Sequence, residues 1–462
     1  MQLNDSSLAL LETTRLNTRQ KIAAAVGGVG LTVFLVAWFS RLALPPAVLW
    51  AALLCLSAGT LAYAHATYAG SPAGIKNNGT MFRSLSNRGL WGYLTAVLLT
   101  GFYVCLYWWP EYLGLGLGGA ANTGLVALFE PMSQGVRGRA ADQWFVYGTF
   151  YTLAVLLLGA KFLWKYRHNR YQIIRTVSVM FFQLGFAFIV PAWMQRMNQP
   201  EFYFTYFWPL KYNYLFPDDI RWLTSSSHLG IFLVGWGVLM SFVAVPVLTY
   251  FFGKRWYCSW VCGCGALAET AGDAFRTLSD KSLKAWRLER YLIHAVLVFI
   301  VLTTVLLWAN SYTQGGVFGG ASQAASKAYS FLIGSMFSGV IGTGFYPIFG
   351  NRVWCRFGCP QAAILGIFQK YFSRFRITTN GGQCISCGNC STYCEMGIDV
   401  KAYAQRGQDI VRASCVGCGI CSAVCPRGVL RLENGTADVS ERATELRALH
   451  FTDDGTVRLR QA

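Results

Sequence analysis

Eight cysteines near the C-terminus fall into two runs with the same spacing. The runs are Cys384, Cys387, Cys390 and Cys394, then Cys415, Cys418, Cys421 and Cys425. Each reads C-x2-C-x2-C-x3-C, in which three thiolates hold one face of an inorganic cube and the fourth cysteine reaches a second cube. The spacing therefore predicts two [4Fe-4S] clusters bound to the same segment.

The expected ligand sets cross over between the runs. We assign Cys384, Cys387, Cys390 and Cys425 to one cluster, and Cys415, Cys418, Cys421 and Cys394 to the other. Gly388 and Gly419 follow the second cysteine of each run, where a tight curl or a positive φ is cheap for glycine. Glu395 occupies the place that Pro426 has in the second run. Zinc is the alternative, but it favours two pairs of cysteines per site over interlocked sets.

Two further turns carry cysteines, each at the end of an apolar segment. They read Lys254-Arg255-Trp256-Tyr257-Cys258-x3-Cys262-Gly263-Cys264 and Asn351-Arg352-Val353-Trp354-Cys355-x3-Cys359-Pro360. The two turns are an internal repeat. Basic residues beside the cysteines favour the thiolate form. Three interpretations stay open. They are a third iron–sulfur site held by Cys258, Cys262, Cys355 and Cys359 with Cys264 as a spare, a redox-active or structural thiol pair at each turn, and simple packing at helix ends.

The elements that must position these cysteines are membrane helices. The chain has 462 residues, of which 54% are hydrophobic and 13% charged, whereas a soluble domain carries about 25% charged residues. Apolar runs long enough to cross a bilayer predict eight spans, near 22–40, 47–68, 91–109, 144–164, 174–194, 228–252, 291–309 and 330–350. The expected fold is an all-α polytopic membrane protein with a small α+β ferredoxin-like module at the C-terminus.

The predicted parts follow in order along the chain. They are a cytoplasmic N-terminal segment (1–21), a membrane domain (22–350), a cysteine turn at the inner membrane face with its connector (351–377), a two-cluster ferredoxin domain (378–431) and a polar tail (432–462). With these boundaries every assigned cluster lies on one side of the bilayer.

The distribution of Lys and Arg predicts how the chain is oriented in the membrane. Of the 39 Lys and Arg, the outer segments hold only Arg41, Arg137, Arg139, Arg196, Lys211, Arg221 and Lys327. Because positive residues stay inside, we expect both termini and the ferredoxin module in the cytoplasm of a bacterial inner membrane, with an uncleaved anchor at the N-terminus. The net charge of +18 then reflects topology and anionic lipid contacts, and not a nucleic-acid partner.

The two cysteine turns followed by a two-cluster module resemble the NapH/NosR group of membrane polyferredoxins, and the related assembly protein for copper-containing oxidases. The resemblance covers about residues 228–430. Cys355-x3-Cys359-Pro360 fits the family motif in full, whereas Gly263 stands where proline is expected and Cys264 is added. The resemblance implies an electron-transfer subunit that works between the quinone pool and a partner protein, and not a stand-alone enzyme.

Histidines and aromatic residues add weaker signals. His65 and His294 have matching depths in two predicted spans, so they are candidate haem ligands, although we expect no haem because both lie near the interface. The segment 199–222 is crowded with aromatic residues. It is either an interfacial belt or a docking surface or quinone-pocket mouth.

Two functions follow from these patterns. In the first, the protein passes electrons between a quinone or a membrane redox subunit and a soluble or peripheral carrier. In the second, it is an assembly factor that reduces a metal or thiols for a respiratory metalloenzyme. The sequence has no Gly-rich dinucleotide fingerprint after a strand, which argues against direct oxidation of a nicotinamide.

Overall fold

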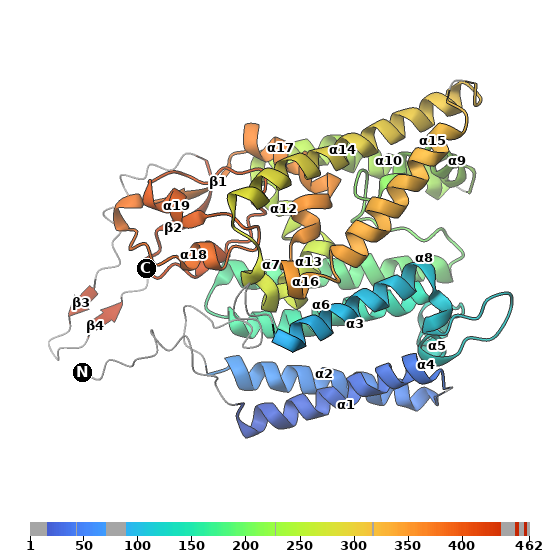
Figure 1. Cartoon of the computed structure of the whole chain (residues 1–462), viewed down its shortest axis with the longest axis horizontal. Helices are drawn as coiled ribbons and strands as arrows, with labels where there is room; N and C mark the ends of the chain where they lie inside the picture. Colours follow the sequence, from blue (N-terminus) through green and yellow to red (C-terminus); the bar gives the residue numbers. More distant parts are fainter. Residues whose placement is uncertain are drawn as a thin grey trace.

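The structure is a computed structural model that describes residues 16–42, 44–70, 89–226, 228–316, 318–435, 449–451 and 457–459. Most of the predicted N-terminal segment and of the polar tail lies outside these residues. The described chain is a helix bundle with a small module at one end (Figure 1). We call this the module end, and the opposite end, which carries α5, α9 and the tips of α14 and α15, the far end.

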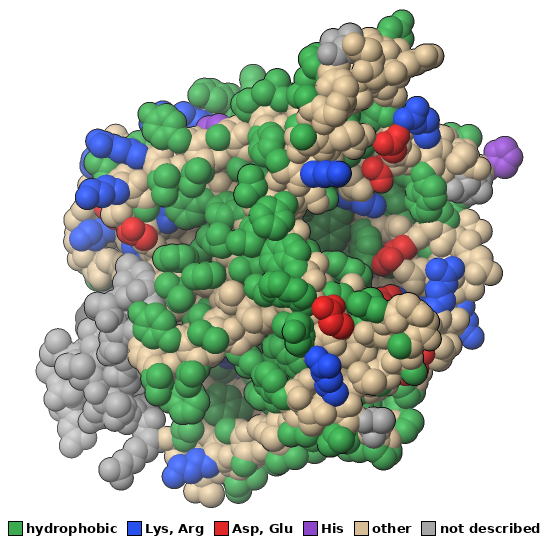
Figure 2. Space-filling view, turned by 45° about the vertical axis from the view of Figure 1, so that its right-hand side comes forward, with side chains coloured by type: hydrophobic (Ala, Val, Ile, Leu, Met, Phe, Trp, Pro, Cys, Tyr) green, Lys and Arg blue, Asp and Glu red, His purple; other side chains and the backbone are tan. Residues whose placement is uncertain are grey.

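Seven helices in the described residues are long and apolar enough to cross a membrane. Their bounds are α1 Thr18–Ser40, α2 Pro46–Tyr68, α3 Gly89–Trp108, α6 Gln143–Lys165, α7 to α8 Arg170–Arg196, α10 to α11 His228–Phe252, and α14 Leu283–Tyr312. They confirm a polytopic, mostly helical membrane protein. Much of the surface in Figure 2 is hydrophobic, as a surface in contact with lipid tails must be.

Two of these helices widen ahead of a proline. Arg170–Arg196 consists of α7 Arg170–Leu184, the π-helical turn η3 Gly185–Ile189 and α8 Val190–Arg196, with Pro191 as the second residue after the turn. His228–Phe252 repeats this arrangement with α10 His228–Leu239, η5 Met240–Ala244, α11 Val245–Phe252 and Pro246. Proline lacks an N–H and clashes with the carbonyl one turn back, so the widened turn lets the helix continue.

The eighth predicted span, 330–350, has a different structure. Helical backbone begins earlier with α15 Gly320–Tyr329, continues as the π-helical segment η7 Ser330–Ile341, and after a turn ends in α16 Tyr346–Phe349. Its glycines permit close packing, since a Cβ on Gly339 would come within 2.6 Å of the Tyr107 ring. The segment therefore packs closely against α3 at Gly339, although Phe331 and Leu332 at its start are exposed, and it does not form an eighth regular helix.

Shorter elements connect the long helices. Those near the far end are η2 Pro110–Leu113, α4 Gly124–Leu128, α5 Glu130–Arg137, η4 Tyr212–Leu215 and α9 Pro217–Ser226. Those around the cysteine turns are α12 Arg255–Cys258, α13 Gly263–Thr270, η6 Ala271–Leu278, η8 Trp354–Gly358 and α17 Pro360–Tyr371.

The module is built on a two-stranded antiparallel sheet. Its elements are β1 Phe375–Thr379, η9 Gly381–Gln383, α18 Asn389–Thr392, α19 Val400–Gln405, α20 Ile420–Ala423 and β2 Leu430–Asn434. The register pairs Phe375 with Asn434 and Thr379 with Leu430, which brings the two ends of the module together. A second hairpin pairs β3 Leu449–Phe451 with β4 Val457–Leu459.

Candidate iron–sulfur sites

The first predicted ligand set comes together in the module. Cys384, Cys387, Cys390 and Cys425 all line one small cavity. Burial raises the pKa of Cys390 to about 11, and the neighbouring sulfurs of Cys425, Cys387 and Cys384 also raise it. Cys387 is exposed, and Gly388 makes the tight curl with a φ of 79°. Cys425 therefore lies with the three cysteines of the first run around one space. The four residues fit a shared cluster.

The second set is more deeply buried. Cys415 and Cys421 are buried, and Cys394 and Cys418 are partly buried. Burial raises the pKa of Cys415 to about 11, while the N–H of Gly417 lowers it by donating to the sulfur and the sulfur of Cys394 raises it. Backbone N–H groups that donate to thiolate sulfurs also set the reduction potential of a bound cluster. Cys394 therefore lies beside the second run, as the spacing predicts.

Side chains from α7, α17 and the first cysteine turn hold the second run by its carbonyl groups. Tyr171 Oη donates to Gly417 O at 2.8 Å, and Gln172 Nε2 donates to Cys418 O at 2.8 Å. Ser259 Oγ donates to Val416 O at 2.8 Å, and Gln369 Nε2 donates to Cys415 O at 2.7 Å. The second set therefore lies between the module and the bundle, whereas the first set is at the outside of the module.

Glu395 anchors the module to the helix bundle. Its carboxylate pairs with Arg276 Nη1 at 3.0 Å and with Arg352 Nη2 at 2.9 Å, and none of the three side chains is exposed. Asn351 Nδ2 donates to the same carboxylate at 3.1 Å. This explains why glutamate, and not proline, follows Cys394: the position is an electrostatic contact with the membrane domain.

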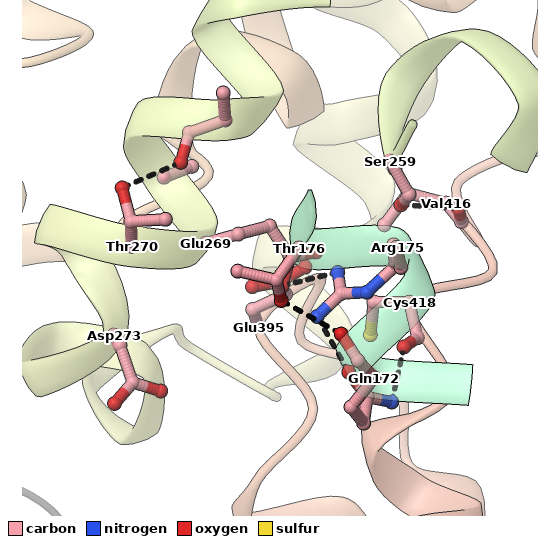
Figure 3. A network of polar contacts seen from close by, with 12 residues as sticks. Gln172, Arg175, Thr176, Ser259, Glu269, Thr270, Asp273, Glu395, Val416 and Cys418 are labelled. Carbon is pink, nitrogen blue, oxygen red and sulfur yellow. Dashed lines mark hydrogen bonds and ion pairs between the residues drawn. The ribbon is translucent and has the colours of Figure 1, made fainter. Parts of the chain in front are cut away.

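The same network continues through Glu269. Glu269 pairs with Arg175, with Arg276 at 3.3 Å and with Arg352 at 2.6 Å. Figure 3 shows Arg175 between Glu269 and Gln172, with the sulfur of Cys418 beside it. Burial alone would raise the pKa of Glu269, but Arg175, Arg352 and Arg276 hold it well below its ordinary value. Buried carboxylates are tolerated when several cations and hydrogen bonds surround them.

Glu269, Glu395 and Cys418 are close enough to suggest a metal site, because one ligand atom of each lies within 4.8 Å of the others. The carboxylates, however, are already paired with guanidinium groups. We therefore assign this trio to the salt-bridge network. Sequence reasoning missed the network, and Glu395 in place of proline was its only visible signal.

The two cysteine turns begin with the same backbone conformation and then differ, since the first continues as an α-helical turn and the second as a π-helical turn. Gly253 and Gly350 precede them with φ values of 67° and 93° and ψ values of −178° and 170°. Cys258, Cys262, Cys355 and Cys359 are all buried. The sulfurs lie close enough to repel one another as thiolates, Cys258 with Cys262 and Cys355, and Cys359 with the other three. The turns thus converge, as a shared site requires.

The four basic side chains beside the cysteine turns make different contacts. Arg352 Nη1 lies 3.6 Å from Cys355 Sγ, and Lys254 is buried with its Nζ donating to Ala413 O at 3.2 Å. Arg255 instead reaches Asn434 in the module at 2.9 Å, and Arg356 pairs with Glu289 at 2.7 Å. Among these four described side chains, Arg352 is the one that hydrogen-bonds to a cysteine sulfur.

The first turn lies deeper than the sequence predicts. Ala266 and Leu267, directly after it, pack against Val155 and Val179 in the middle parts of α6 and α7. A Cβ on Gly263 would come within 2.9 Å of Oε1 of Gln183, the central residue of Arg170–Arg196. The turn therefore begins at the module, where Ser259 Oγ donates to Val416 O, and enters the bundle at Gly263. Cys264, the added cysteine, hydrogen-bonds with Cys262.

The structure does not bring the two candidate haem ligands together. His65 lies on α2 and His294 on α14, and these helices are on opposite sides of the bundle (Figure 1). Both side chains are exposed, and the His65 ring packs edge-on against Trp164 with centroids 5.8 Å apart.

Family models match both cysteine regions. A model described as a 4Fe-4S binding domain matches residues 234–282 and again 332–379, and one described as a 4Fe-4S dicluster domain matches residues 383–430. The first model matches both cysteine turns, so it confirms that the two turns are an internal repeat. The matches also confirm that the chain carries [4Fe-4S]-binding domains.

Curated relatives have related descriptions. YccM of Escherichia coli K12, provisionally described as an electron transport protein, is 26% identical over 36% of this chain and 48% of its own length. The methylamine utilization ferredoxin-type protein MauN of Methylobacillus flagellatus is 28% identical over 34% of this chain and 53% of its own. The regulatory protein NosR of Stutzerimonas stutzeri is 26% identical over 39% and 24%. The chain spans about half or less of the length of these relatives. No solved structure matches it.

Proposed function

We propose that this membrane-type 4Fe-4S ferredoxin carries electrons between a partner at its module and a redox partner in or at the membrane bundle. The observation that carries the proposal is the order of its cysteine sets. One set is at the outside of the module with Cys387 exposed, the next lies where the module meets the bundle, and the third lies inside the bundle. Bound [4Fe-4S] clusters would supply one-electron exchange, and the chain supplies their spacing and surroundings.

The ligands we propose are the crossed sets Cys384, Cys387, Cys390 and Cys425, then Cys415, Cys418, Cys421 and Cys394. The third site would be held by Cys258, Cys262, Cys355 and Cys359. Four buried cysteines on two turns that begin with the same glycine conformation support it, as does the match of one 4Fe-4S model to both turns.

The partner at the module would be a soluble or peripheral electron carrier. Lys401 and Arg427 line the cavity of the exposed cysteine set together with Cys387. Positive charge at this position attracts an acidic carrier and speeds association. The charge bias of the loops supports a cytoplasmic position for the module, so we place the protein in the inner membrane of a bacterium, with a quinone or a redox subunit as its membrane partner.

The test is a count of iron and acid-labile sulfide per chain after anaerobic purification. Three cubane sites give about twelve irons per chain, and two give about eight. The double variant Cys355→Ser, Cys359→Ser should lose about four irons and one signal in the electron paramagnetic resonance spectrum, while Cys55→Ser, a lone cysteine on α2, loses none. Unchanged iron in the double variant would remove the third site, and iron-free protein would remove the whole proposal.

One observation favours a second candidate function, the reduction of a metal ion or thiol during assembly of another enzyme. Cys264 belongs to none of the crossed sets, yet it lines a cavity that also reaches residues at the far end. The variant Cys264→Ala separates the two functions. If it keeps full iron and full electron transfer to an artificial carrier but fails to support a metalloenzyme in the cell, the assembly function is favoured.

A further inference from the structure

One arginine lies between the two cysteine turns. Arg352 is three residues before Cys355 in the chain, and only 1% of its surface is exposed. Its Nη1 donates to Cys355 Sγ at 3.6 Å and to Cys258 O at 3.4 Å. A single nitrogen therefore contacts a sulfur of the second turn and the backbone of the first.

Two carboxylates hold the other nitrogens of this guanidinium group. Nε donates to Glu395 Oε1 at 3.0 Å, and Nη2 pairs with Glu269 Oε1 at 2.6 Å. A guanidinium group is flat and its N–H groups point in fixed directions, so the contacts at Nε and Nη2 determine where Nη1 points. Nη1 is thus held toward Cys355 Sγ, and it cannot turn away without loss of a buried ion pair.

The internal repeat contains a matching arginine that makes different contacts. Arg255 occupies the position of Arg352 in the first turn, three residues before Cys258. Its Nη2 donates to Asn434 Oδ1 at 2.9 Å, and its guanidinium group lies 4.5 Å from the centre of the Phe375 ring. In the part of the chain that the structure describes, its side chain donates to oxygen atoms and to no sulfur. The repeat is therefore asymmetric, because one of its two arginines donates to a proposed ligand and the other does not.

This asymmetry affects the electron affinity of a cluster at the third site. A bound [4Fe-4S] cluster shares its negative charge with its cysteine sulfurs, and each electron that it accepts adds one negative charge. An N–H group that donates to such a sulfur binds the reduced state more strongly and so raises the reduction potential. Glu269 and Glu395 offset the positive charge of Arg352 itself, so the effect depends on the direction of the Nη1–H bond and acts at short range.

We propose that Arg352 is a positioning residue that raises the reduction potential of the third site through its hydrogen bond to Cys355 Sγ. The inference rests on the proposed function, because that function places a [4Fe-4S] cluster on the four cysteines of the two turns. It deepens the function by naming the residue that determines how readily this site accepts an electron.

A redox titration of the full-length protein, purified without oxygen, tests this role. Dithionite supplies the electrons stepwise, and electron paramagnetic resonance records each cluster. The signal of the third site is the one that Cys355→Ser, Cys359→Ser removes. In Arg352→Gln, whose side chain is uncharged and shorter, we expect the reduction equilibrium of this signal to shift about tenfold toward the oxidised form, which lowers the midpoint potential by about 59 mV for one electron.

Two controls come from the same contacts. Arg255→Gln removes a guanidinium group from the equivalent position of the repeat and should leave the midpoint of the third site unchanged, because Arg255 donates to no sulfur. Glu395→Gln removes a carboxylate from Arg352 but keeps the Nη1–H group, so it should not lower this midpoint. The double variant Arg352→Gln, Glu395→Gln leaves no unpaired carboxylate at this position, and it should show the lowered midpoint with full iron.

The outcomes separate this role from a purely structural one and from failure of the third site. Full iron with an unchanged midpoint in Arg352→Gln and in the double variant overturns the proposal, and so does an equal shift in Arg255→Gln. Loss of the third site's iron in both Arg352 variants would mean that this residue only holds the turns together, which also overturns it. A wild-type protein with about eight irons overturns the proposed third site itself.

Discussion

Glu395 shows how one residue joins two parts of this molecule. It follows a cysteine of the more deeply buried set, and its carboxylate lies among Arg276, Asn351 and Arg352, which are outside the module. Four buried cations (Lys165, Arg175, Arg276 and Arg352) already face only three carboxylates (Glu269, Asp273 and Glu395) in this network. Loss of one carboxylate would therefore leave buried positive charge without compensation.

We expect Glu395→Ala to destabilise the protein by about 3–5 kcal/mol, as removal of one partner from a buried ion pair does. The measurement is the temperature at which the visible cluster absorbance is lost. Asp218→Asn is the matched control, because Asp218 pairs with Arg221 at an exposed position and should change stability by less than about 1 kcal/mol. Equal shifts for the two variants would show that Glu395 is not an anchor.

Gly263 gives a second prediction for a single residue. Gly263→Ala adds one methyl group where Tyr206 Oη would be 2.2 Å away, so we expect an overpacking penalty of about 1–3 kcal/mol. Gly135→Ala on α5 is the control, since nothing lies within 4 Å of its added Cβ. Thermal stability of the two variants checks the difference, and a neutral Gly263→Ala would mean that Tyr206 is free to move aside.

At the scale of elements, α1 and α2 form a closely packed helix pair. A Cβ on Gly59 of α2 would lie 2.3 Å from Gly27 N, and one on Gly30 of α1 would lie 2.5 Å from Ala52 O. Small residues let membrane helices approach closely when no hydrophobic effect drives them together. The pair is therefore held by backbone proximity at these glycines.

Gly59→Leu should separate α1 from α2 and destabilise the pair, whereas Gly28→Ala should be neutral or stabilising by up to about 1 kcal/mol, because Gly28 has nothing within 4 Å. Oxidative cross-linking of a cysteine pair introduced across the two helices measures their separation. Undiminished cross-linking in Gly59→Leu would contradict this account.

The sequence predicted most of the elements but not how the cysteine turns are placed. Hydropathy located the seven long helices, because each contains an apolar stretch of membrane-spanning length. It could not show that the first turn enters the bundle, since Ala266 and Leu267 look the same in a sequence whether they pack at the membrane surface or against Val155 and Val179. The ferredoxin spacing was informative because ligand geometry is local, whereas Gln183 and Tyr206 meet Gly263 only through the tertiary fold.

At the scale of the whole molecule, the two ends carry different sites. The module end carries the exposed cysteine set, and the cavity that Cys264 lines reaches residues at the far end. In the proposed function, the third cysteine site would add a redox group deeper than the two sets of the module.

This arrangement predicts opposite accessibility for the two ends. Asp218 is 74% exposed at the far end, and Arg406 is exposed in the module. A membrane-impermeant maleimide should label Asp218→Cys in intact spheroplasts and Arg406→Cys only in inverted vesicles, because the loops rich in Lys and Arg remain in the cytoplasm. Reaction of both cysteines from the same side would mean that the module and the cavity mouth share one face, and a route for electrons from one membrane face to the other would then be excluded.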